Sequence, residues 1–209
     1  MRKLLTLNKD GQLALRTGDG TETVIERRAI NVLLLLDTSG SMAGSKIEQA
    51  KSGAIDFAQS ASARGYDTAL AVFADRAAMV CDATNDVAVL ARKMARLNVG
   101  VVGGSTDLAK GLVLAGKFAE LAAVVVVTDG QSNDNKAALA AAATLKSRSV
   151  DIICIGTDDA DRDFLARLAT RSDLAMHVAA KDLRTSIRAA SRLLTGSSGA
   201  QLDTGRYRK

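Results

Sequence analysis

Three short, almost entirely apolar runs constrain the fold of this chain more than any other feature. They lie at Ile30–Leu36, Ala123–Val127 and Asp151–Ile155, and stretches with helical periodicity separate them. A strand that is apolar on both of its faces is typical of a parallel sheet buried between layers of helices. Strands that alternate with helices in this way predict an α/β fold with a sheet covered on both faces.

The remaining pattern completes a doubly wound, Rossmann-like, mostly parallel sheet with helices on both faces. Further strands are expected at residues 68–73, 77–81 and 174–178. Helices are expected at residues 46–64, 86–97, 108–121, 136–148, 161–170 and 183–194.

Residues 1–28 are expected to form an N-terminal β-hairpin packed on the domain. Asp10 and Gly11 lie between two short apolar stretches, and Asp-Gly in that position is a strong hairpin signal. A third short strand is expected at 21–27. The predicted organisation is therefore N-terminal strands at 1–28, one α/β domain at 29–195 and a flexible basic tail at 196–209.

The net charge of +5 is concentrated at the C-terminal end of the chain. Residues 181–209 carry seven basic and two acidic side chains, which accounts for the whole excess. A basic segment can attract nucleic acid or an anionic surface, and binding of that kind is one alternative function. Aromatic side chains, which stack on single-stranded bases, make up only 3% of the residues. Nucleic acid is therefore not the expected partner.

Cys81 and Cys154 lie in apolar stretches and match no zinc-site spacing, so two buried free thiols are expected. Free thiols fit a reducing compartment. The N-terminal apolar run is too short for a secretory signal, and no apolar stretch approaches the roughly 18 residues of a membrane span. We therefore expect a cytoplasmic protein without a membrane segment.

Three oxygen-rich loops carry the candidate chemistry. Residues 37–41 (D-T-S-G-S) follow the first apolar run, residues 128–130 (T-D-G) follow the second, and residues 103–107 (G-G-S-T-D) precede the helix at 108. Ligands of such sheets bind at the carboxyl ends of the strands, where the strand order reverses. Because Asp37, Ser39 and Ser41 alternate, an extended or gently turning backbone would point all three side chains the same way.

Oxygen donors of this kind suit a hard cation. Magnesium takes six oxygen ligands and keeps some waters, whereas no thiol or imidazole lies near these loops to favour zinc or copper. A turn with a helix cap is the simpler interpretation of residues 37–41 alone, and it is weakened by the two other loops. A phosphate-binding loop at 40–46 is excluded because the spacing between the glycines and Lys46 is wrong.

Together, D-x-S-x-S, G-S-T-D and T-D-G resemble the metal-ion-dependent adhesion site (MIDAS) of von Willebrand factor A domains, over roughly residues 30–194. The stand-alone bacterial members are the most similar. The resemblance implies a sheet with one antiparallel edge strand, here 77–81. It also implies that Ser39, Ser41 and Thr106 bind the ion directly, and that Asp37 and Asp129 bind it directly or through water.

The resemblance further implies a module that grips a partner protein through the ion. We expect Mg²⁺, with Mn²⁺ as an alternative that accepts the same oxygens and Ca²⁺ ranked below both. A partner's Asp or Glu carboxylate would replace one metal-bound water, and no small-molecule substrate is expected. A magnesium-dependent phosphotransfer or hydrolase enzyme with Asp37 as nucleophile is the other alternative, but position 39 holds Ser rather than a general acid.

Two further features have structural interpretations. His177, the only histidine, is expected to be structural, because no nucleophile motif accompanies it. The acidic cluster at 158–163 lacks the pattern of a calcium loop and is expected to place negative charge at a helix N-terminus. Asp107 is expected to open its helix for the same reason.

Overall fold

The computed structural model describes residues 4–7, 13–24, 30–99, 105–158 and 160–195, and the chain divides into two compact units, the larger of which is Ile30–Ser197. In the smaller unit, β1 (Leu4–Leu7), β2 (Leu13–Arg16) and β3 (Glu22–Val24) form an antiparallel sheet in that order. The predicted N-terminal hairpin is confirmed, while its turn at Asp10 and Gly11 lies outside the described residues. Packing of these strands on the larger unit stays a prediction, and the predicted tail at 196–209 lies outside the described residues.

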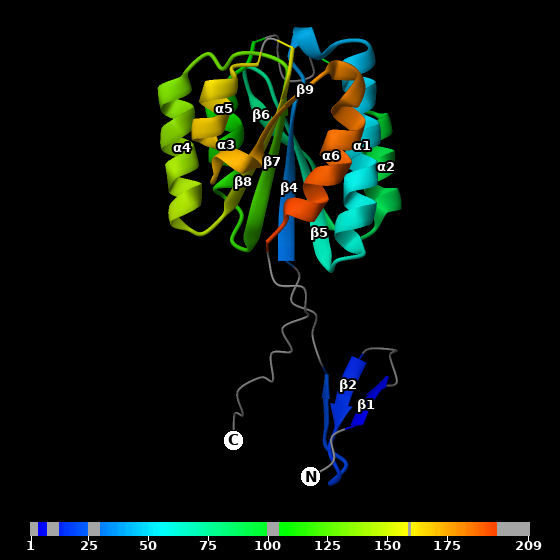
Figure 1. Ribbon diagram of the computed structural model, residues 1–209. Coiled ribbons are helices and arrows are strands. Elements are labelled where there is room, and N and C mark those ends of the chain that lie inside the picture. Colours follow the sequence, from blue (N-terminus) through cyan, green and yellow to red (C-terminus); the bar gives the residue numbers. More distant parts are fainter. Residues whose placement is uncertain (1–3, 8–12, 25–29, 100–104, 159, 196–209) are drawn as a thin grey trace. The chain divides into compact units, whose positions relative to one another are not determined.

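The larger unit contains a six-stranded sheet, shown nearly edge-on in Figure 1. Its strands follow the order β6-β5-β4-β7-β8-β9, and every neighbouring pair is parallel except β5 and β6. The predicted doubly wound sheet with one antiparallel edge strand is therefore confirmed. The strands are β4 (Ile30–Asp37), β5 (Tyr66–Phe73), β6 (Ala77–Thr84), β7 (Leu121–Thr128), β8 (Asp151–Thr157) and β9 (Ala175–Val178).

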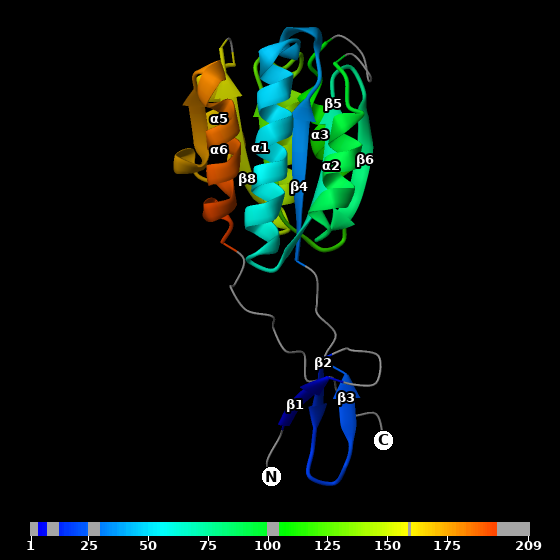
Figure 2. The same cartoon turned by 90° about the vertical axis from the view of Figure 1, so that its right-hand side faces the viewer.

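Helices cover both faces of this sheet. Figure 1 shows α1, α2 and α6 on one face and α3, α4 and α5 on the other, and Figure 2 turns the first of these layers toward the viewer. The helices are α1 (Ser45–Ser62), α2 (Val87–Ala95), α3 (Leu108–Ala115), α4 (Asn135–Ser147), α5 (Arg162–Leu168) and α6 (Leu183–Ala190). None of the helices in the described ranges is long and apolar enough to cross a membrane.

The central strands form the middle of the hydrophobic core. Every residue of 32–36 in β4 and of 124–127 in β7 is buried, as expected for strands with helices on both sides. On one face α3 approaches β4 so closely that a Cβ added to Gly111 would lie 2.8 Å from Cδ2 of Leu35. The apolar runs of the sequence thus became the strands that the helices enclose.

Aspartate side chains begin four of the helices. Asp86, Asp107, Asp134 and Asp161 each accept a hydrogen bond from a backbone N–H in the first turn of α2, α3, α4 and α5, respectively. Such caps satisfy donors that have no partner within the helix. The predicted capping role of Asp107 is confirmed, and in the acidic cluster Asp161 is the residue that caps α5.

Two predicted helices are shorter than their apolar patterns. The helix expected at 108–121 ends at Ala115, and β7 already begins at Leu121. The guanidinium of Arg148 binds the carbonyl oxygens of Gly116 and Phe118, which fixes a turn there in place of further helix. The helix expected at 183–194 ends at Ala190 and continues as a 3₁₀ turn at Ser191–Leu193.

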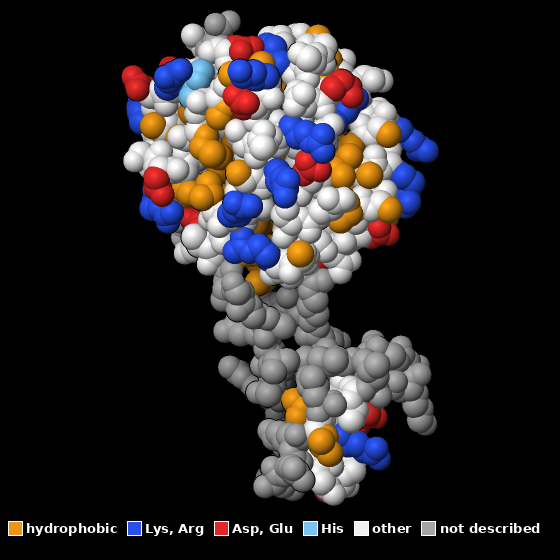
Figure 3. Space-filling model, turned by 45° about the vertical axis from the view of Figure 1, so that its right-hand side comes forward, with side chains coloured by type: hydrophobic (Ala, Val, Ile, Leu, Met, Phe, Trp, Pro, Cys, Tyr) orange, Lys and Arg blue, Asp and Glu red, His pale blue; other side chains and the backbone are white. Residues whose placement is uncertain are grey.

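The face formed by α1 and α6 is basic, and Figure 3 shows Lys and Arg side chains along it. Two of these arginines hold α6 against α1. Arg184 donates to both carboxylate oxygens of Asp56, at 2.7 and 3.3 Å. Arg64, at the end of α1, binds the carbonyl oxygens of Ser191 and Leu194. Close to the contact between Arg184 and Asp56, a Cβ added to Gly53 would lie 3.0 Å from Cα and O of Arg184.

We expect Gly53→Ala to lower the free energy of unfolding by about 1–2 kcal/mol, because the new methyl group has to push α6 away. The better helix propensity of alanine, about 1 kcal/mol, opposes this loss. Chemical denaturation measures the effect, with Gln59→Ala on the exposed side of α1 as control, expected to change stability by no more than about 0.5 kcal/mol. A stabilised Gly53→Ala protein would contradict the close packing described here.

Candidate metal centre

The three predicted loops meet at the carboxyl ends of β4 and β7, which are neighbours in the sheet. The chain winds from β4 toward β5 on one side and continues through β7 toward β8 on the other, so the strand order reverses between β4 and β7. Side chains that follow two such strands face a common crevice. The site predicted from the sequence therefore lies at the crevice that is expected where the strand order reverses between β4 and β7.

Hydroxyl groups from different loops converge there. The hydroxyl of Ser41 donates to Oδ1 of Asp129 at 2.7 Å, and it lies 3.1 Å from the hydroxyl of Ser39. A Cβ added to Gly130 would lie 3.3 Å from Oγ1 of Thr106 and 3.9 Å from Oγ of Ser41. The structure thus brings Ser39, Ser41, Thr106 and Asp129 together, although 88 residues separate Ser41 from Asp129.

The backbone of the first loop is extended as far as Ser39, with φ −61° and ψ 167°, and then turns tightly. Residues Gly40–Met42 form a 3₁₀ turn, in which the N–H of Met42 donates to the carbonyl of Ser39 at 3.1 Å. The predicted extended or gently turning backbone is therefore found in the first part of the loop, and the turn at Gly40–Met42 is tighter than predicted. The turn brings the two serine hydroxyls together, and the buried side chain of Met42 anchors it in the core.

Asp37 is completely buried at the end of β4. Its Oδ1 accepts a hydrogen bond from the backbone N–H of Ser39 at 2.8 Å, and its Oδ2 accepts one from the hydroxyl of Thr128 at 2.6 Å. Burial raises the pKa of Asp37 above the ordinary value of an aspartate, and the hydrogen bonds from Thr128 and Ser39 oppose this shift. The sequence contained Thr128 in T-D-G, but its pairing with Asp37 was not predicted.

Asp129 also has no exposed side-chain surface, and a lysine pairs with it. The ammonium group of Lys46 binds Oδ2 of Asp129 and also Oδ2 of Asp158, the latter at 2.9 Å. Burial alone would lower the pKa of Lys46, but its bonds to the two carboxylates outweigh burial and raise it. The bond from Lys46 in turn lowers the pKa of Asp158. Neither Lys46 nor Asp158 was predicted to belong to the site.

The third loop is fixed by backbone hydrogen bonds on both sides of the site. The carbonyl of Thr106 accepts from the N–H of Asn133 at 2.8 Å, and the N–H of Asp107 donates to the carbonyl of Ala74 at 2.7 Å. Thr106 is only 8% exposed. Its hydroxyl is therefore positioned by the loops after β5 and β7. The first two residues of the predicted loop, Gly103 and Gly104, lie outside the described residues.

The donor set fits a hard divalent cation. It consists of two carboxylates and three hydroxyls, and the described part of the chain contains no group of three or more His, Cys, Asp or Glu side chains that could hold a metal ion. Cys81 and Cys154 are buried free thiols, as predicted, and burial raises the pKa of Cys154 to about 12. A thiol of that pKa stays protonated and is a poor metal ligand. The candidate ligands are therefore all oxygen atoms, which are the ligands of hard divalent cations.

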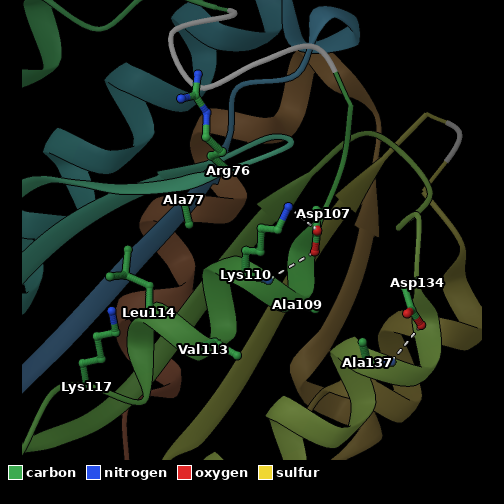
Figure 4. Close-up of a pocket in the computed structure, with 10 residues that line it drawn as sticks. All are labelled: Arg76, Ala77, Asp107, Ala109, Lys110, Val113, Leu114, Lys117, Asp134 and Ala137. Atoms are coloured by element: carbon green, nitrogen blue, oxygen red, sulfur yellow. Dashed lines mark hydrogen bonds and ion pairs between the residues drawn. The ribbon is translucent and has the colours of Figure 1, made fainter.

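A separate hollow of about 570 Å³ lies over α3 (Figure 4). Arg76, Lys110 and Lys117 stand around it, and Val113, which is 58% exposed, forms part of its lining. Figure 4 shows Lys110 turned toward the carboxylate of Asp107, which it binds at 3.0 Å. None of the five predicted ligands lines this hollow, so the hollow and the candidate metal centre are neighbouring but distinct features.

Residues 31–191 match the family model of the von Willebrand factor type A domain. The chain belongs to this family. The match covers the whole sheet of the larger unit apart from Ile30 in β4, together with all six helices. Comparison with curated proteins yields no match.

Solved structures of the same fold come from several different organisms. Proximal thread matrix protein 1 of the mussel byssus is 19% identical, with a TM-score of 0.66 over 82% of this chain and 47% of its own. This chain thus spans about half the length of the mussel protein. The von Willebrand factor domain of the type V pilus tip protein Mfa5 from Porphyromonas gingivalis is 13% identical to this chain. Its TM-score is 0.69 over 88% of this chain and 99% of its own. Manganese-loaded TRAP protein of Plasmodium vivax is 16% identical, with a TM-score of 0.62 over 77% and 72%.

Two buried threonines allow the role of Thr128 to be tested. We expect Thr128→Val to lower the free energy of unfolding of metal-free protein by about 1–3 kcal/mol, because the Asp37 carboxylate loses a buried donor. Thr68 in β5 is the matched control, since it is equally buried and its hydroxyl has no hydrogen-bond partner. Thr68→Val is therefore expected to be neutral or stabilising. Equal losses in the two variants, measured by urea denaturation in EDTA, would disprove the special role of Thr128.

Proposed function

We propose that this domain is a divalent-metal-dependent protein-interaction module. In it, Asp37, Ser39, Ser41, Thr106 and Asp129 hold Mg²⁺ or Mn²⁺. The observation that carries the proposal is the meeting of three hydroxyls and two buried carboxylates at the reversal of strand order. Burying two carboxylates close together without a cation costs free energy, because each carboxylate loses its hydration when it enters the protein interior.

Structural relatives support a divalent ion at this place in the fold. The mussel byssus protein has also been solved with a zinc-occupied MIDAS motif, and the Plasmodium vivax protein was solved with manganese. Among these ions, the all-oxygen donor set of the present chain favours manganese or magnesium. Ca²⁺ ranks lower because it takes six to eight oxygens, more than these loops supply without many waters.

The charge balance indicates what kind of partner such a site attracts. Only Asp37 and Asp129 contribute negative charge as ligands, and Lys46 already pairs with Asp129. The three hydroxyls are neutral. When bound, the ion would supply a positive contact for a carboxylate oxygen of a partner's Asp or Glu. The burial of both aspartates lowers the effective dielectric constant around the ion, which strengthens this contact.

Binding is a better interpretation of this arrangement than catalysis. The phosphotransfer alternative requires a general acid or base beside Asp37. In the described structure the charged group that acts on Asp37 is Asp129, and Asp129 itself pairs with Lys46. His177 is engaged elsewhere, with its Nε2 3.2 Å from the carbonyl oxygen of Asp158.

The metal site is tested by thermal unfolding of metal-stripped protein with and without added Mg²⁺, Mn²⁺ or Ca²⁺. A ligand that binds only the native state adds about 2.7 kcal/mol at a hundredfold excess over Kd. We expect Mg²⁺ and Mn²⁺ to raise Tm in the natural protein and to have no effect in Asp37→Ala or Asp129→Ala. Asp173→Ala, which removes an exposed ion pair with Arg171, is the control and should keep the rise. A natural protein without any rise would mean that these five residues do not hold an ion in the natural chain by themselves.

The carboxylate contact has its own test. Water next to bound Mn²⁺ relaxes rapidly in proton magnetic resonance, and a carboxylate that replaces an inner water reduces this effect. We expect titration of acetate into the Mn²⁺-loaded protein to lower water proton relaxation in a saturable manner, while an equal concentration of chloride does not. Unchanged relaxation at saturating acetate would mean that the ion is structural and not a contact for partners.

A further inference from the structure

Lys46 connects two carboxylates that belong to different loops. Its ammonium binds Oδ2 of Asp129, whose side chain is fully buried, and Oδ2 of Asp158, whose side chain is 40% exposed. The lysine side chain itself is 21% exposed. Lys46 lies in the first turn of α1, Asp129 follows β7 and Asp158 follows β8. The lysine therefore connects the start of α1 to the loops that follow β7 and β8.

The two carboxylates offer the ammonium very different surroundings. Asp129 is a proposed metal ligand, and any cation that draws on its oxygens competes with Lys46 for the same negative charge. Asp158 stands at the surface and was not assigned to the metal by any feature of the sequence. An ammonium has three donors, so Lys46 can give up its bond to Asp129 and keep the bond to Asp158.

Asp158 is held in the position that this exchange requires. Its backbone has a φ of 51°, in the left-handed region that few residues other than Gly, Asn and Asp adopt. Its carbonyl oxygen lies 3.2 Å from Nε2 of His177, and its Oδ1 accepts from the hydroxyl of Thr157 at 3.3 Å. The second carboxylate for Lys46 is thus fixed by contacts from β8 and β9 and does not depend on the metal site.

We propose that Lys46 is a resident counter-ion that sets the metal affinity of the site, and that Asp158 is the carboxylate that accepts it when a divalent cation binds. This inference rests on the proposed function. In its terms, Lys46 stabilises the buried Asp129 in metal-free protein and weakens metal binding by competition. Asp158 relieves the competition because it retains the ammonium without using Asp129.

The proposal predicts opposite effects for the two partners of one ion pair. Lys46→Met removes a partly buried positive charge that competes with the ion for Asp129. We therefore expect Mg²⁺ to bind roughly tenfold more tightly to this variant. Asp158→Asn leaves the ammonium with Asp129 alone, so we expect Mg²⁺ to bind about threefold or more weakly. Asparagine tolerates positive φ as well as aspartate does, which keeps the loop intact.

The experiment is a double-mutant cycle on the whole chain. Calorimetric titration of Mg²⁺ gives Kd for the natural protein, Lys46→Met, Asp158→Asn and the double variant. The effect of Asp158→Asn should shrink to within about twofold when Lys46 is absent, because only its screened, direct attraction for the ion remains. Lys110→Met is the matched control, since Lys110 binds Asp107 next to Thr106 but contacts none of the five ligands. It should change Kd by no more than about twofold.

Thermal unfolding in EDTA provides a readout that needs no metal. Lys46→Met should lower Tm of the metal-free protein, since Asp129 then lacks its counter-ion while buried. Saturating Mg²⁺ should narrow the difference in Tm between the two proteins, because a tenfold gain in affinity adds about 1.4 kcal/mol to the stability of Lys46→Met. A Lys46→Met protein that is as stable as the natural one in EDTA would overturn the counter-ion role.

The remaining outcomes separate this inference from the proposed function. If the natural protein binds Mg²⁺ and Lys46→Met binds it equally or more weakly, Lys46 is a structural ion pair and only this inference fails. The same holds if Asp158→Asn binds as the natural protein does. If neither the natural protein nor folded Lys46→Met binds Mg²⁺ or Mn²⁺, both the metal site and this inference are wrong.

Discussion

The hydrogen bonds to the buried carboxylate of Asp37 are the interaction on which the candidate site depends. Thr128 reaches it from the end of β7, and Ser39 reaches it from the turn that follows β4. A charged group is tolerated in such a position only when donors surround it. These bonds therefore fix the ends of β4 and β7 relative to each other. The positions of the two serine hydroxyls and of Asp129 depend on that arrangement, because these residues follow the two strand ends.

The rest of the site follows from the winding of the sheet. Parallel strands deliver their carboxyl ends to one edge, and the reversal of strand order between β4 and β7 leaves that edge uncovered by a crossover. The apolar strands contribute no chemistry of their own. They hold short polar loops against one another so firmly that residues distant in the chain share hydrogen bonds. The core and the site are thus two results of the same pattern of strands.

The sequence predicted most of this, because the signals involved are local. Apolar runs at 30–36 and 123–127 indicated buried strands, and the loops directly after them named four of the five candidate ligands. The failures involve contacts across the fold. Nothing near Ala115 shows that Arg148 will fix a turn after it, and nothing near Lys46 shows that Asp158 lies beside it. The turn at Gly40–Met42 was missed because alternation of residue types does not determine backbone geometry.

The first and last described residues of the larger unit, Ile30 and Thr195, lie at the edge of the sheet where the parallel strands begin, whereas the candidate metal centre lies where β4 and β7 end. Ile30 begins β4, and the hydroxyl of Thr195 binds Asp151 at the first residue of β8. The seven steps from Ile30 to Asp37 along β4, at about 3.3 Å each, place these residues roughly 23 Å apart. The described ends of the larger unit and the candidate metal centre therefore lie at opposite ends of the strands, so the polar crevice does not share an edge of the sheet with Ile30 or Thr195.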